Sequence, residues 1–252
     1  MAQVRGLERF LKDEQFLHAG KLDVLHGTTL AFDAVTYFQS LLPDNALHLP
    51  MGGISLDLTS AVDKILAQLT NLNITPIFIF PGLENVSIGR NEENFKNNCW
   101  SAWQNFSRGN AKTAAFNFSE AGGWSINVEN AIFNYLNSNK ITVLRAPGSV
   151  HAQIGYLCQP GNSIVHGCVG PSAMMLYGAD RVISSLSWSN NRTEWTQLTE
   201  ILNGLGLSQK EFIEVCLLAG NPPLVIIKPL IEIALITLYS PYTLPINLNK
   251  PW

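Results

Sequence analysis

Two side chains of the sequence, Asp33 and His151, are of types that bind metal ions in proteins. Asp33 directly follows residues 28–32, a β-branched and apolar run that is typical of a buried strand. One carboxylate does not hold Mg²⁺ tightly, because this ion dehydrates reluctantly and demands octahedral coordination. Together with His151 it would supply half of a transition-metal site. We favour a simpler interpretation, in which Asp33 accepts hydrogen bonds from backbone N–H groups at the strand end.

Two further polar residues receive structural interpretations. Asp180, the only Asp after Asp63, is expected to cap a turn next to Arg181. His166 lies in an apolar run and is expected to be a buried histidine whose hydrogen bonds are satisfied.

Residues 84–127 combine aromatic rings with positive charges in a polar, weakly periodic stretch. The aromatic residues are Trp100, Trp103, Phe106, Phe116, Phe118 and Trp124, and the cations are Arg90, Lys96, Arg108 and Lys112. Such a mixture can stack single-stranded bases or anchor a protein partner. The interpretation that we rank first is a hydrophobic lid over a cleft. Partner binding ranks second, with Arg90, Lys96, Trp100, Trp103, Arg108 and Lys112 as its surface, and RNA binding ranks third.

Composition narrows the function classes. The 252 residues carry 16 Lys and Arg against 19 Asp and Glu, a net charge of −3, so strong salt-driven nucleic-acid affinity would need a local basic patch. The apolar stretch 224–238 is interrupted by Lys228, Pro229 and Glu232 and is too short to span a bilayer. Four scattered cysteines predict reduced thiols in the cytoplasm. The sequence contains no G-x-G-x-x-G, P-loop or G-x-S-x-G motif.

Strand and helix patterns alternate along the chain. Strands are expected at 28–32, 76–80, 142–146, 163–169 and 181–185, and helices at 6–11, 35–42, 56–72, 128–136, 150–158, 193–202 and 208–218. Ser149 is expected to cap the helix at 150–158. This order predicts an α/β fold with a mainly parallel, five-stranded central sheet and helices on both faces.

Five stretches, in this order, resemble the flap-endonuclease/XPG superfamily, whose core is a PIN-like domain. Val4–Leu7 is similar to that family's "G-I-x-G-L", and Leu30–Ala34 to its first strand, which ends in Asp. Asn73–Gly82 is similar to its "P-x-x-V-F-D-G" segment and Arg145–Ala152 to its "A-P-x-E-A-E-A" segment. Gly204–Gly220 is similar to its "L-G-L … C-I-L-x-G-S-D-Y" segment. The resemblance covers about residues 3–223.

The departures from that family concern its metal ligands. The family hydrolyses phosphodiesters with two divalent ions held by clustered carboxylates. Of seven family acids only Asp33 is kept, and the other positions correspond to Pro81, Ser149, His151, Ser172, Met174 and Pro222. The family's helical arch is basic, whereas residues 85–130 hold four cations and four anions. The resemblance therefore implies a pseudo-nuclease that is not an enzyme and holds no metal or cofactor.

One branch of the superfamily has lost its acids in this way, the MKT (maintenance of killer toxin) post-transcriptional regulators. The chain is similar to them in Met51–Leu56 and in residues 74–83. The resemblance implies an XPG/PIN-like interaction domain at 1–223, with an arch-like insert at 84–127 and a C-terminal helix and Pro-rich tail at 224–252. In that family a C-terminal domain, which this chain is expected to lack, contacts an ataxin-type, poly(A)-binding-protein-associated partner. A divergent metal-dependent nuclease and a single-stranded RNA-binding module remain the alternatives.

Overall fold

The computed structural model describes residue 4 and residues 6–40, 53–54, 57–82, 88–121, 124–159 and 165–220. The helix and Pro-rich tail expected at 224–252, and the position Pro222, lie outside these described residues.

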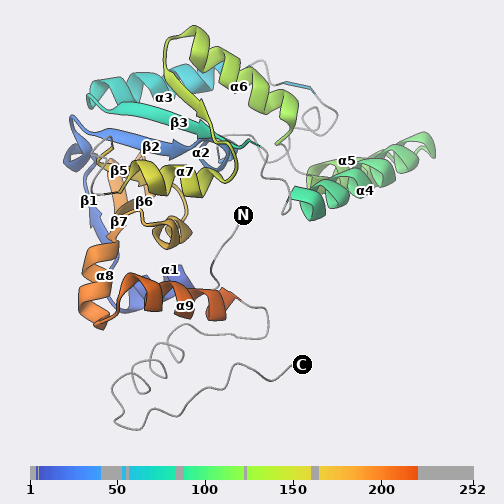
Figure 1. Cartoon of the computed structure of the whole chain (residues 1–252). Helices are drawn as coiled ribbons and strands as arrows, with labels where there is room; N and C mark the ends of the chain where they lie inside the picture. The colour runs from blue at the N-terminus through green and yellow to red at the C-terminus, as the bar shows by residue number, and fades with distance from the viewer. Residues whose placement is uncertain are drawn as a thin grey trace, which may run out of the picture.

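Seven strands of the described residues form one sheet in the order β1-β7-β6-β5-β2-β3-β4 (Figure 1). The strands are β1 His18–Gly20, β2 Thr29–Asp33, β3 Thr75–Phe80, β4 Thr142–Arg145, β5 Gly167–Val169, β6 Arg181–Ser187 and β7 Arg192–Gln197. The five expected strands are β2 to β6, and their pairings with one another are all parallel. The α/β fold with a parallel centre is thus confirmed.

The expected strand count was too low, because β1 and β7 extend one edge in antiparallel pairings. Residues 193–197 were expected to begin a helix, but they belong to β7. Thr193 and Thr196 are the buried residues of this strand, and their spacing of three resembles that of a helix face. Residues three positions apart in a strand point to opposite faces, so Thr193 and Thr196 are buried on different sides of the sheet.

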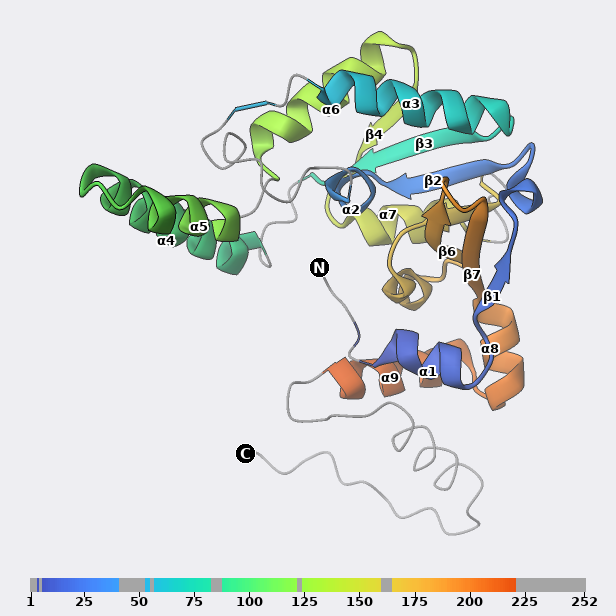
Figure 2. The same cartoon turned by 180° about the vertical axis from the view of Figure 1, so that it is seen from behind.

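Helices cover both faces of the sheet (Figures 1 and 2). On one face, α2 Ala34–Gln39, α3 Leu58–Asn71 and α6 Ile126–Ser138 enclose a core centred on Phe32, Phe38 and Phe78. The opposite core joins the remaining helices of the body to β2, β3, β5 and β6. These helices are α1 Leu7–Asp13, α7 Val150–Leu157, the 3₁₀ helix η2 Ser172–Tyr177, α8 Leu198–Leu205 and α9 Gln209–Gly220. A further 3₁₀ helix, η1, spans Leu22–Leu25.

The insert forms a helical hairpin, made of α4 Ile88–Ser107 and α5 Ala111–Ala121. The turn between them contains Gly109, whose φ of 80° is readily adopted only by glycine. Both views show the hairpin projecting sideways from the body (Figures 1 and 2). Over the described residues, no helix is long and apolar enough to cross a membrane.

Candidate functional site

The carboxyl ends of the central strands bring together Asp33, His151 and Met174, which are far apart in the sequence. Asp33 ends β2, His151 lies in the first turn of α7, and Met174 lies in η2, just after β5. In open α/β sheets ligands bind at this end of the strands. The resemblance to the flap-endonuclease/XPG superfamily also places that family's metal site at the carboxyl ends of these strands.

Both carboxylate oxygens of Asp33 have partners within the chain. Oδ1 accepts a hydrogen bond from the Thr36 backbone N–H at 3.1 Å, and Oδ2 accepts one from the Thr36 hydroxyl at 2.7 Å. Asp33 is therefore the N-cap of α2, in agreement with the interpretation that we favoured. His151 Nε2 lies 3.4 Å from Oδ2, so the pairing of these two residues is also found. Asp33 is only 4% exposed, so its carboxylate finds its partners within the chain rather than in solvent.

Met174 fills space beside this pair. Its side chain is fully buried, and its Cε would lie 2.3 Å from a Cβ placed on Gly170. The Cβ of Asp33 would lie 3.4 Å from that same position, so the thioether and the carboxylate border the same small volume. A side chain at Gly170 would force the end of the Met174 side chain to move. A methyl group thus occupies a position where the resemblance placed an acid.

The other degenerate positions are structural or buried. Ser149 caps α7 by accepting from the Ala152 N–H at 3.5 Å, as expected. The Pro81 carbonyl accepts from Arg145 Nη1 at 3.1 Å. Ser172 is buried at the start of η2, and Pro222 lies outside the described residues. Within the described part of the chain, no three His, Cys, Asp or Glu residues gather as a metal site would require.

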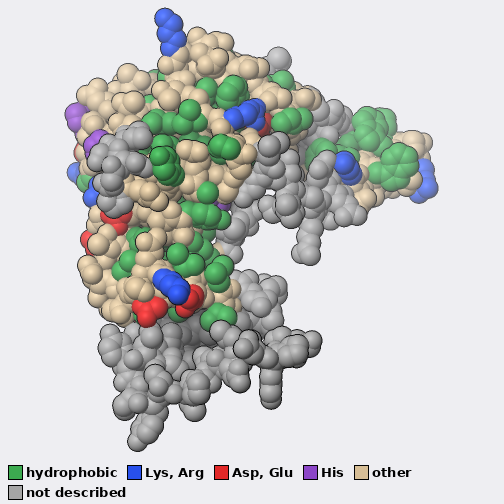
Figure 3. All heavy atoms as spheres, viewed as in Figure 1, with side chains coloured by type: hydrophobic (Ala, Val, Ile, Leu, Met, Phe, Trp, Pro, Cys, Tyr) green, Lys and Arg blue, Asp and Glu red, His purple; other side chains and the backbone are tan. Residues whose placement is uncertain are grey.

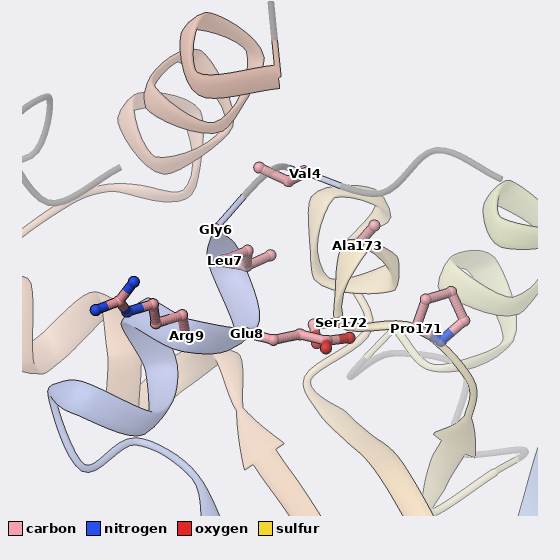
Figure 4. A pocket seen from close by; sticks show the side chains of 8 residues that line it. All are labelled: Val4, Gly6, Leu7, Glu8, Arg9, Pro171, Ser172 and Ala173. Carbon is pink, nitrogen blue, oxygen red and sulfur yellow. The ribbon is translucent and has the colours of Figure 1, made fainter. Parts of the chain in front are cut away.

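A groove opens next to this region, between α1 and η2 (Figure 4). It has a volume of about 330 Å³ and is lined by Val4, residues 6–9 and residues 171–173. The Glu8 side chain extends towards Ser172, whereas Arg9 points away from the groove (Figure 4). The groove walls contain one carboxylate and no histidine. It is a mainly apolar depression without the ligand set of a metal site.

Two residues that the sequence did not single out support the site. Thr36 supplies two of the contacts of Asp33, and the Asp-x-x-Thr spacing is a capping signal that could have identified it. Arg145 donates to the buried Glu129 at 2.7 Å and to Asn130 at 3.0 Å, which ties β4 to α6. No short sequence pattern marks this pair, because it joins residues 16 positions apart.

Asp180 and His166 were expected to have structural roles, and one expectation needs correction. Asp180 Oδ1 accepts from the backbone N–H of Thr199 at 2.9 Å and from its hydroxyl, so it caps the first turn of α8. His166 is exposed rather than buried, because it precedes β5 at the strand entrance. Its Nδ1 accepts from the Thr29 N–H at 3.0 Å and so continues the ladder to β2.

The hairpin does not act as a lid, which corrects the interpretation that we ranked first. Trp100 is 67% exposed and Phe116 is 62% exposed, and Trp103 and Phe106 are also exposed. α4 and α5 pack chiefly on each other, through Ala102, Ala114 and Phe118. Lys96, Arg108 and Lys112 are exposed on the same hairpin, while the side chain of Arg90 lies outside the described set. The aromatic side chains therefore remain available to a ligand.

The comparisons with known proteins agree with this fold. The family model of the XPG I-region matches residues 140–221. The chain is 27% identical over 235 residues to the post-transcriptional regulator MKT1 of Cryptococcus neoformans, and 22% identical over 285 residues to MKT1 of Saccharomyces cerevisiae. These matches cover 86% and 92% of the chain but only 30% and 34% of the two regulators. The chain thus spans about a third of their length.

Nucleases are similar to the chain as well. The flap endonuclease 1 of Cryptosporidium muris is 23% identical over 241 residues, covering 86% of this chain and 51% of that protein. Among solved structures, the catalytic core of Rad2 in complex with DNA substrate has a TM-score of 0.62, with 17% identity over 93% of this chain and 67% of that one. The flap endonuclease-1 of Methanococcus jannaschii has a TM-score of 0.59, with 18% identity over 89% of this chain and 78% of that one. The chain therefore has the fold of the XPG and flap-endonuclease proteins and, over most of its length, resembles the MKT1 regulators, with an XPG I-region at residues 140–221.

Proposed function

We propose that the chain is a non-catalytic XPG/PIN-like interaction domain of an MKT-type post-transcriptional regulator, and that it acts in the cytoplasm by protein–protein contact. The regulator class is supported by three MKT1 relatives, from Cryptococcus neoformans, Saccharomyces cerevisiae and Schizosaccharomyces pombe. The non-catalytic character is inferred from the residues at the carboxyl ends of the strands. Fold alone does not decide between these classes, since one fold hosts many functions.

The observation that carries the proposal is the state of Asp33. Both oxygens accept hydrogen bonds from Thr36 and His151 lies against Oδ2, so the contacts of this carboxylate are accounted for by a helix cap and a single imidazole. Two divalent ions bound close together need several carboxylates to compensate their charge. The described residues at this end of the sheet supply one carboxylate, one imidazole and a buried thioether, which do not fit that requirement. We therefore derive no metal-dependent step for this site.

The domain limits and the partner belong to the same proposal. We assign residues 1–223 to the XPG/PIN-like domain, with 84–127 as its arch-like insert, and residues 224–252 to a C-terminal helix and Pro-rich tail. The resemblance to the MKT family implies a protein partner of the ataxin type, contacted through a further domain of the whole regulator. Direct contacts of this chain would then supplement that interaction.

A flap-cleavage assay tests the proposal against its nuclease alternative. The purified chain, at high concentration, is incubated with flap DNA in Mg²⁺ or Mn²⁺, beside an active flap endonuclease as positive control. We expect no cleavage above that of buffer. The matched variant is Asp33→Asn, because Asn retains the capping oxygen of the helix and removes the charge. Metal-dependent cleavage that this variant abolishes would overturn the proposal and favour a rebuilt nuclease site.

A further inference from the structure

The far half of the α4–α5 hairpin presents an apolar and cationic surface that the fold does not use. We define the hairpin patch as Trp100, Trp103, Phe106, Arg108 and Lys112, all of which are exposed. The three aromatic residues follow one another at intervals of three along α4, so they form a stripe on one side of the helix. Figure 3 shows hydrophobic side chains gathered over the hairpin with Lys and Arg side chains beside them.

The exposed aromatic residues are not needed to pack the two helices of the hairpin against each other. Among the hairpin side chains that the structure describes, those buried are Ala102, Ala114 and Phe118. Trp103 meets Phe118 edge-on at 5.3 Å and Phe106 edge-on at 6.1 Å, which fixes the orientation of its ring and leaves half of it in solvent. Orienting the rings in the free protein reduces the ordering cost of binding. Exposed Trp residues of this kind are the commonest hot-spot residues of protein interfaces.

The charge of the patch specifies its partner. Arg108 and Lys112 flank the turn of the hairpin, and neither forms an ion pair within the described part of the chain. Glu120 is the one acidic residue between positions 95 and 121, and it lies at the opposite end of α5. The patch is therefore positive on a chain whose net charge is −3. Charge complementarity favours an acidic ligand at this place.

We propose that the hairpin patch docks a short protein segment that has apolar anchors flanked by acidic residues, an inference that rests on the interaction role given above. From Trp100 to Arg108 the patch extends about 12 Å along α4, at 1.5 Å per residue. This length suits two turns of an amphipathic helix or a few extended residues. Single-stranded RNA fits less well, because two cations do not form the continuous basic groove that tracks a phosphate backbone.

Selection from a displayed library of random short peptides tests this proposal without knowledge of the natural partner. The full chain is the bait, and the selected peptides are then titrated against variants by fluorescence anisotropy. Trp100→Ala and the double change Arg108→Glu with Lys112→Glu alter the patch. Phe116→Ala is the matched aromatic control, because Phe116 lies two positions from both Ala114 and Phe118 and so faces away from α4. Lys64→Glu, an exposed cation on α3, is the matched charge control.

We expect the selected peptides to be acidic and to carry aromatic or aliphatic anchors. Trp100→Ala and the double charge reversal should each weaken their binding by about tenfold or more, and the two controls by less than about twofold. Peptides without acidic character, or peptides that bind Trp100→Ala as tightly as the parent, would overturn the proposal. Polyuridylate RNA that binds the patch more tightly than any peptide would replace it with an RNA surface, and self-association lost in Trp100→Ala would replace it with a second copy of the chain. Circular dichroism of each variant checks that the hairpin is folded.

The result of the peptide selection can be distinguished from the result of the flap-cleavage assay. That assay reads the Asp33 end of the sheet, whereas the selection reads the hairpin, and the two share no altered residue. Cleavage together with acidic peptides would refute the proposed function but keep the docking surface. A chain that cleaves no DNA and whose selected peptides bind the patch variants as tightly as the parent would keep the proposed function but refute the docking surface.

Discussion

At the scale of single residues, Asp33 holds α2 in place through hydrogen bonds to both of its carboxylate oxygens. Its two oxygens accept from Thr36, and His151 lies against one of them. A carboxylate retained for such reasons contributes to stability, whereas a carboxylate retained for catalysis commonly lowers it. The sign of the stability change on mutation therefore separates the two roles.

Asp33→Ala is expected to lower the free energy of unfolding by about 1–2 kcal/mol, because it removes the cap of α2. Chemical denaturation followed by circular dichroism measures the change. Asp57→Ala is the matched control, since Asp57 is the N-cap residue of α3 but makes no side-chain capping bond. That control should change the stability by a few tenths of a kcal/mol at most. An increase in stability in Asp33→Ala would contradict the structural role.

The cysteines are expected to react in a defined order. A hydrogen bond from the Cys168 thiol lowers the pKa of Cys158, which is half-buried at the end of α7, whereas burial raises the pKa of Cys216 to about 12. The thiolate is the reactive form, so the lower pKa gives Cys158 the larger reactive fraction at mildly alkaline pH. Iodoacetamide should modify Cys158 well before Cys216, as followed by peptide mass spectrometry. Similar rates for both in the folded chain, with the denatured chain as control, would contradict the structure.

Residue-level prediction from sequence succeeded where a local signal or the family resemblance existed. The capping roles of Asp33 and Ser149 follow from residue type and position, and the resemblance aligned Asp33 and His151 with ligands of one site. The burial of Met174 over Gly170 could not be foreseen, because it depends on the path of η2 after β5. His166 was misplaced because a run of apolar neighbours does not reveal that the strand begins one residue later.

At the scale of elements, the five parallel strands were predictable because each is a continuous apolar run between turn residues. β7 was not, since its two buried residues, Thr193 and Thr196, are polar and lie three positions apart, as on a helix face. The hairpin was also missed, because the buried residues among its described side chains are two alanines and a single ring, Phe118. Exposed aromatic residues there obscured the helical period.

Close packing between α7 and η2 gives an element-scale prediction. A Cβ on Gly155 would lie 2.3 Å from the backbone oxygen of Tyr177, so Gly155→Ala must push η2 away from α7. We expect a loss of about 1–3 kcal/mol in the free energy of unfolding, measured by urea denaturation. Gly148→Ala is the matched control, because a Cβ there meets nothing within 4 Å. Equal stability of the two variants would show that the contact between the elements is looser than the structure gives.

At the scale of the whole molecule, the chain combines the nuclease fold with a site that does not fit two metal ions. Its body superposes on the flap endonuclease of Methanococcus jannaschii with a TM-score of 0.59 at 18% identity. The described residues at the ends of its strands place one carboxylate, Asp33, among Thr, His and Met side chains. The sheet and the two cores do not depend on the metal ligands, because the cores consist of apolar residues on either side of the strands. Loss of the ligands therefore leaves the fold intact.

The most direct test of the central claim is a calorimetric titration of Mn²⁺ into the purified chain and into Asp33→Asn. Asn keeps the capping oxygen, so both proteins should be folded and comparable. We predict no saturable binding at millimolar metal and identical heats for the two proteins. Micromolar binding that is present in the parent chain and lost in Asp33→Asn would show that Asp33 belongs to a working metal site and would contradict the account.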